Sequence, residues 1–236
     1  MPMEEGIRAD VRDKRYVNSG NSGLDARLSS DTQSALDVGC GSGAHARTLV
    51  ARGCTVDGIT LSQAEQSDAL PYCRRCWIHD LESGLPSEVR DDCDLVVASH
   101  VLEHLRWPDR LLREVRSVLA PARGRLLCAL PIVLFYKHRF RLLSGRFEHE
   151  ESGIMDASHF RWFTFDSAAR LIKQAGFKFL AHFGDGNAPL PMIRRLWPES
   201  VSKAIDRAVS NPMPGMFASQ ALIVATPGPS AQDPSS

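Results

Sequence analysis

The sequence lacks any apolar segment long enough to cross a bilayer. Its longest apolar run, 126–136, has 11 residues and contains Pro131, whereas a membrane-spanning helix needs about 20. The first residues carry neither a basic stretch nor an apolar core, so we expect no secretory signal. We therefore expect a cytoplasmic protein without a membrane span.

The chain also lacks an excess of charge of either sign and has few cysteines. Its 28 Lys and Arg balance 28 Asp and Glu, so no overall field favours nucleic acid, and we expect no nucleic-acid partner. Six cysteines without an export signal predict reduced thiols. Cys73 and Cys76, with His79 close by, lack the fourth ligand of a structural zinc site, so we expect no metal.

The length of 236 residues and an apolar content of 43% predict one folded domain with appendages. Residues 1–33 are polar and predict an N-terminal arm or lid. The main domain is expected at 34–226, with an insertion at 184–216 that is rich in Pro, Gly and Asn and holds a helix near 199–210. The tail, 227–236, is predicted to be disordered.

Short apolar strands alternate with helical stripes along the first half of the chain. Strands are predicted at 34–38, 54–59, 77–79, 94–99 and 125–130, and helices at 44–52, 108–119 and 164–175. This alternation predicts a parallel sheet with crossover helices, in which ligands bind at the carboxyl ends of the strands. Two later strands, 177–183 and 217–226, lack such a helix between them and predict an antiparallel edge pair.

The most distinctive motif is Leu-Asp-Val-Gly-Cys-Gly-Ser-Gly at 36–43. Glycines at alternate positions permit a sharp turn that brings backbone N–H groups against a ligand at a helix start. The same glycines satisfy the dinucleotide fingerprint, so NAD or FAD stays open here. That site needs an acid where Thr60 stands, and Glu65 follows one helical turn later. Alternatively, Thr60 or Ser62 caps a helix and Glu65 is solvated.

Three motifs together resemble the class I methyltransferases that use S-adenosylmethionine. The glycine turn with Asp37 is similar to their first motif. The motif after their third strand is similar to Asp80-Leu81 followed by Leu85-Pro86. The run 94–104, Asp-Leu-Val-Val-Ala-Ser-His-Val-Leu-Glu-His, resembles their fourth-strand motif. A weaker likeness at 153–164 is to small-molecule and sugar methyltransferases.

The resemblance implies an α/β fold, a Rossmann-like seven-stranded sheet of order 3-2-1-4-5-7-6, with strand 7 antiparallel and helices on both faces. It also implies S-adenosyl-L-methionine as cofactor. The methionine part of the cofactor would contact Asp37, Gly39, Cys40, Gly41 and Gly43, and its amine would contact the carbonyl of Ser99. The ribose would contact Thr60, Leu61 and Glu65, and the adenine would contact Asp80 and Leu81. Thr60 departs from the acid of most members and resembles the variant in cyclopropane-fatty-acid synthases.

We expect methyl transfer to a small-molecule acceptor, a hydroxyl of a sugar or related metabolite. A hydroxyl needs a base, and histidine titrates near neutrality. His159, in the run His-x-Arg-Trp-Phe-Thr, is the first candidate and His104 the second; a structural role is the alternative for each. The basic run 137–146 would hold a phosphate-bearing substrate or an acidic carrier, or else is a solvated amphipathic segment.

Two other functions remain compatible with the sequence. One is a nicotinamide or flavin oxidoreductase on a related fold, which the missing acid at Thr60 disfavours. The other is a non-catalytic domain that binds the cofactor or a partner. Arg161, Trp162 and Phe163 are expected to line an acceptor pocket, unless the two aromatic side chains belong to the core.

Overall fold

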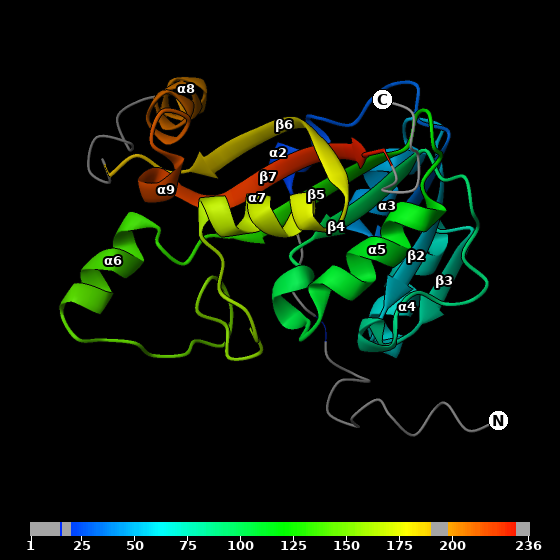
Figure 1. Cartoon of the computed structure of the whole chain (residues 1–236), viewed down its shortest axis with the longest axis horizontal. Coiled ribbons are helices and arrows are strands. Elements are labelled where there is room, and N and C mark those ends of the chain that lie inside the picture. Colours follow the sequence, from blue (N-terminus) through cyan, green and yellow to red (C-terminus); the bar gives the residue numbers. More distant parts are fainter. Residues whose placement is uncertain (1–14, 16–19, 190–197, 230–236) are drawn as a thin grey trace.

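A seven-stranded sheet forms the centre of the protein (Figure 1). The computed structural model describes residue 15 and residues 20–189 and 198–229. The spatial order of the strands is β3-β2-β1-β4-β5-β7-β6. Their bounds are β1 Ser34–Val38, β2 Thr55–Thr60, β3 Arg75–Ile78, β4 Leu95–Ser99, β5 Arg125–Pro131, β6 Phe177–Gly186 and β7 Ala218–Pro227.

The strand directions confirm the predicted Rossmann-like α/β fold. Strands β1 to β5 pair in parallel, with Asp37 of β1 opposite Gly58 of β2 and Val97 of β4. Strand β7 lies antiparallel between β5 and β6. A short connection suffices for an antiparallel neighbour, whereas parallel strands need a crossover of a dozen residues or more. The number of residues between successive strands therefore predicts which strands pair in parallel and which pair antiparallel.

Helices cover both faces of this sheet (Figure 1). The α-helices of the described residues are α2 Ser22–Asp25, α3 Ala44–Val50, α4 Gln63–Ala69, α5 Pro108–Val118, α6 Tyr136–Leu143, α7 Phe165–Gln174, α8 Glu199–Ser210 and α9 Pro214–Phe217. Short 3₁₀ turns are η1 Leu70–Tyr72, η2 Leu81–Ser83 and η3 Leu102–His104. None of the helices in this part of the chain is both long and apolar enough to cross a membrane.

The core is divided between the two faces because alternate strand residues point to opposite sides. Leu36 of β1 packs with Leu112 of α5 and Ile172 of α7. On the other face, α2 contributes Leu24 and α3 contributes Leu49. Each of these side chains is almost fully buried, and burying one stabilises the fold by about 1.5–3 kcal/mol.

Several predicted boundaries shift in the structure. Strand β3 begins at Arg75, before the apolar run that predicted it, because Arg75 pairs with Asp57 of β2. Strand β6 extends to Gly186, so the predicted insertion begins later than 184. Strand β7 ends at Pro227, inside the predicted tail. The helix predicted at 199–210 is α8, while α4, α6 and α9 have no counterpart among the predicted helices.

Parts of three predicted segments lie outside the described residues. These are 1–14 and 16–19 of the arm, 190–197 of the insertion and 230–236 of the tail.

Within the described chain, the carboxyl ends of β1, β2 and β4 meet at one edge of the sheet. Gln220 of β7 reaches the same edge, opposite Pro131 of β5 and Asp185 of β6. Most of the predicted site residues collect there.

Candidate active site

The turn between β1 and α3 has the conformation that its glycines permit. Gly39, Gly41 and Gly43 all have a positive φ, +71°, +51° and +80°, which side chains other than glycine rarely adopt. A Cβ on Gly39 would lie 2.4 Å from Cγ2 of Val101. The turn therefore requires glycine both for its backbone and for close packing on the segment after β4.

Asp37 lies at the base of this turn and is 1% exposed. Its Oδ2 has no hydrogen-bond partner among the described residues, and burial raises the pKa of the carboxyl group to about 6. A buried carboxylate with an unpaired oxygen costs free energy. A ligand with a positively charged group would offset that cost, so the site fits an amino-acid cofactor with an ammonium group.

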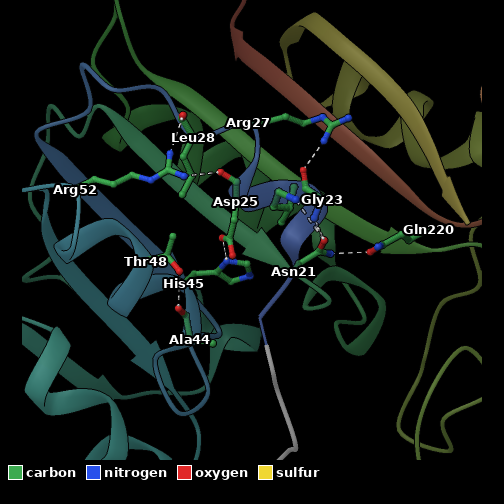
Figure 2. Close-up of polar contacts among 11 residues, drawn as sticks. Asn21, Gly23, Asp25, Arg27, Leu28, Ala44, His45, Thr48, Arg52 and Gln220 are labelled. Atoms are coloured by element: carbon green, nitrogen blue, oxygen red, sulfur yellow. Dashed lines mark hydrogen bonds and ion pairs between the residues drawn. The ribbon is translucent and has the colours of Figure 1, made fainter. Parts of the chain in front are cut away.

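A polar network joins α2 to this end of the sheet (Figure 2). His45 Nδ1 lies 2.8 Å from Oδ1 of Asp25, and the side chain of Asn21 caps α2. Asn21 Nδ2 donates to Oε1 of Gln220 at 2.7 Å, and His100 Nε2 lies 3.0 Å from the same oxygen. This network was not predicted from the sequence. Its signal was an asparagine in cap position before a short helix.

His45 faces two carboxyl groups. Burial lowers the pKa of His45, but the hydrogen bond with Asp25 and the charges of Asp37 and Asp25 outweigh it, so the pKa is raised. Arg52, which follows α3, donates to the carbonyls of Leu28 and Asp25 (Figure 2). These contacts fasten α2 to α3, and so hold His45 near Asp37.

Thr60 and Glu65 form a buried pair where β2 ends. Thr60 Oγ1 donates to Oε2 of Glu65 at 2.8 Å, and each residue is 3% exposed. Ser62 caps α4 through its side chain. The alternative with Ser62 as cap is therefore right about the cap, but wrong about Glu65, which is buried. Leu61, between the two, has an exposed side chain.

Asp80 follows β3, and Ser99 ends β4. Asp80 caps η2, with its Oδ1 accepting from the N–H of Glu82 at 2.9 Å, and Leu81 is buried behind it. Ser99 is the last residue of β4. The next residue, His100, has φ +55°, an uncommon conformation for a residue other than glycine that is typical of functional sites.

Cys40 lies within the turn, and its thiol lies 3.5 Å from the carbonyl of Gly41. Its N–H donates to the carbonyl of Ile59 at 2.8 Å, and its buried Sγ lies 3.8 Å from Sγ of Cys76. His79, considered with Cys73 and Cys76 in the sequence, instead has its Nε2 3.1 Å from the carbonyl of Gly84.

The two candidate bases come together beside β4. The rings of His104 and His159 lie edge to face, 4.7 Å between centroids, although 54 residues separate them. The carbonyl of Glu103 accepts from the N–H groups of Phe160 and Arg161, which holds the segment 150–164 against η3. Burial lowers the pKa of His159, so its imidazole is neutral near pH 7.

The predicted acceptor-pocket residues separate in the structure. Phe163 is 6% exposed and belongs to the core. Trp162 packs edge to face against His159, with 5.7 Å between ring centroids, while the guanidinium of Arg161 donates to the carbonyl of Arg106.

The basic run 137–146 forms α6 and the turn after it. Arg139 donates to the carbonyls of Leu134 and Gly215, and Arg141 pairs with Glu150. Two of the four cations of the run are therefore engaged within the chain.

A family model described as a methyltransferase domain matches residues 14–182. The chain belongs to this family. Members of the methyltransferase domain family use S-adenosylmethionine as methyl donor, which decides between the two cofactor classes that the glycine pattern left open. The resemblance seen in the sequence is thereby confirmed.

Named relatives agree with this membership. Ubiquinone biosynthesis O-methyltransferases from Pseudomonas putida and Pseudomonas entomophila are 30% identical over 110 residues, 42% of this chain. The match spans 44% of these relatives, less than half of their length.

Solved structures of distant sequence share the fold. A methyltransferase from Mesorhizobium loti has a TM-score of 0.59 at 17% identity, over 86% of this chain and 95% of its own. The cyclase SpnF has a TM-score of 0.56 at 18% identity, over 93% of this chain and 88% of its own. At such identity the likeness shows the fold alone.

Proposed function

We propose that this chain transfers a methyl group from S-adenosylmethionine to a hydroxyl oxygen of a small molecule, a sugar or related metabolite. The observation that carries the proposal is the glycine turn with the buried, incompletely paired carboxylate of Asp37 at its base. That carboxylate complements an ammonium group, and the N–H groups of the turn complement a carboxylate, so the two together suit an amino-acid moiety.

The other cofactor residues take the roles that their positions allow. When bound, S-adenosylmethionine supplies a methyl group on a positively charged sulfur. Glu65, held by Thr60, accepts from ribose hydroxyls at the end of β2. Asp80 and Leu81 hold the adenine, and the carbonyl of Ser99 accepts from the cofactor amine. Holding both reactants in line for displacement is worth about 7–11 kcal/mol of barrier.

A base beside the acceptor completes the proposal. Nδ1 of His159 lies 3.1 Å from the carbonyl of Ile154, to which it donates, so Nε2 is left to take the proton from the acceptor hydroxyl. The lowered pKa keeps this imidazole neutral at pH 7 and ready to accept a proton. His104, in ring contact with His159, is the second candidate.

The relatives support oxygen as the acceptor atom. The Pseudomonas proteins are named for O-methyl transfer in ubiquinone biosynthesis. Because the match covers less than half of them, their substrate does not pass to this chain, and sugars and phenols are tested side by side.

The test incubates purified protein with methyl-labelled S-adenosylmethionine and separate pools of sugars, sugar phosphates and phenols, and follows the label by mass spectrometry. We expect a labelled methyl ether in one pool, lost in the Gly41→Val variant because a bulky side chain cannot adopt the turn. Binding of the donor without product from any pool would contradict the proposal.

A further inference from the structure

Three residues on two segments form a compact group next to the glycine turn. Glu103 and His104 lie on η3, and His159 comes from the segment that covers it. Each offers one ligand atom, and these atoms lie within 4.8 Å of one another. The group adjoins the turn because Val101, two residues before Glu103, packs against Gly39.

The carboxylate of Glu103 lacks the partners that its burial requires. Glu103 is 1% exposed, and its Oε2 has no hydrogen-bond partner within the described part of the chain. Oε1 lies 3.3 Å from Nδ1 of His100. Leaving a buried carboxylate oxygen unpaired costs free energy, which a bound cation would offset.

The hydrogen bonds around the two histidines orient them as ligands. Ser158 Oγ donates its one proton to Oδ1 of Asp156 at 2.6 Å, so at 3.0 Å it accepts from Nδ1 of His104. Nδ1 of His159 donates to the carbonyl of Ile154. Both rings then carry the proton on Nδ1 and the lone pair on Nε2, the arrangement that metal-bound histidines share.

We propose that Glu103, His104 and His159 bind a first-row divalent metal ion such as Zn²⁺ or Co²⁺. Two imidazoles and one carboxylate suit such an ion and leave coordination positions open. Donors at about 2.0–2.2 Å from one ion lie about 3–4 Å apart, so binding requires side-chain shifts of about 1 Å. In the sequence, a metal was considered only at Cys73 and Cys76; this group has no local signal because Glu103 and His159 are far apart along the chain.

The ion has a chemical role that rests on the proposed function. An acceptor hydroxyl at an open position has its pKa lowered by the ion, as bound water does. The O–H bond breaks and the proton passes to water; the oxygen then takes the methyl group, and the sulfur keeps the electron pair of the broken bond. With the ion bound, Nε2 of His159 is a ligand and does not act as the base, and the ion takes over the activation of the hydroxyl that the proposed function assigns to His159.

Metal binding is measured directly on the full chain. Protein stripped with a chelator and dialysed is titrated with Co²⁺ alone, with calorimetry and visible absorption as readouts. We expect one ion per chain, at least about 100-fold weaker binding in Glu103→Gln and His159→Gln, and unchanged binding in His149→Gln. His149 is a matched control because it packs on the same Trp162 but lies outside the group.

Titration with S-adenosylmethionine separates the two proposals. All three variants should keep the wild-type donor affinity, which also shows that they are folded. Wild type that binds no Co²⁺, or variants that bind it as tightly as wild type, would overturn the metal site. Wild type that binds Co²⁺ but does not bind S-adenosylmethionine would instead count against the proposed function.

Discussion

At the scale of single residues, the site combines groups that are costly to the fold. Asp37 is buried with one oxygen unpaired, and its folded-state pKa of about 6 exceeds the ordinary value of 3.8. The folded protein therefore holds this proton more tightly than the unfolded chain does. The resulting stability is present below the ordinary pKa and is lost as the pH rises through about 6.

Replacement of Asp37 by Asn tests this carboxylate. We expect the affinity for S-adenosylmethionine to fall about 10-fold or more, since a hydrogen bond to a charged group contributes about 1.5–3 kcal/mol. Wild-type affinity should increase as the pH rises through about 6, because the charged carboxylate binds the ammonium group, and the variant should lose this dependence. Calorimetric titration from pH 5 to 7.5 measures both.

The stability of the same variant provides the control. Any pH dependence of stability that persists in the variant comes from other titratable groups, among them His45, whose pKa is raised. Above pH 6 the ligand-free variant should unfold no more easily than wild type, because a neutral amide replaces a buried charge. A variant that is both less stable and fully able to bind the donor would contradict the assigned role.

Gly39 offers a second test at this scale. Gly39→Ala places a Cβ 2.4 Å from Val101, whereas Gly53→Ala, also at a positive φ, meets nothing within 4 Å. Both share the backbone strain of about 1 kcal/mol, and only the first adds a clash. Donor affinity should fall in Gly39→Ala and stay unchanged in Gly53→Ala; equal behaviour in binding assays would refute the close packing of the turn.

At the scale of elements, caps and short connections position the site. Thr164 and Ser167 form a capping box at the start of α7, with each side chain bonded to the other's backbone. This cap fixes the end of the segment that carries His159. The helix predicted at 164–175 is confirmed as α7, with Thr164 as its N-cap.

Thr164→Ala should lower the free energy of unfolding by about 1 kcal/mol, the usual value of a cap. Ser67→Ala is the control, because Ser67 is exposed within α4 and its hydroxyl only bonds back to the carbonyl of Gln63. We expect a change below about 0.5 kcal/mol there. Denaturant unfolding measures both, and equal losses would argue against the cap.

Prediction succeeded for elements with a strong local pattern, and it failed where pairing with a neighbouring strand sets the end of a strand. The apolar stripe 108–119 predicted α5, and its boundary differs by one residue. Strand β6 was predicted three residues too short, because Asp185 is polar and enters the strand through its pairing with Gln220 of β7. The cross-strand partner of a residue lies far away along the chain, so a local sequence pattern does not reveal the pairing.

At the scale of the whole molecule, two hydrophobic clusters share one sheet, with α5 and α7 on one face and α2, α3 and α4 on the other. The donor is expected to bind at the carboxyl edge between these layers. A ligand that binds the folded state alone stabilises the entire unit by mass action.

S-adenosylmethionine at 100 times its Kd should therefore stabilise the fold by about 2.7 kcal/mol. For a chain of this size that raises Tm by about 5–10 °C. NAD at equal concentration should leave Tm unchanged. Thermal unfolding followed by circular dichroism measures the difference, and a rise with NAD alone would contradict the cofactor assignment.

The sequence by itself determined the fold class and the strand ends where the site lies, because alternate glycines, apolar periodicity and helix caps act over a few neighbouring residues. The cofactor came from the resemblance of three motifs to a known family, which the family match confirmed. The tertiary structure decided which side chains meet. Glu65 is buried against Thr60, α2 reaches Gln220, and Glu103, His104 and His159 form one group. The last two contacts join residues distant in the sequence, and only the packing of the sheet edge brings those residues together.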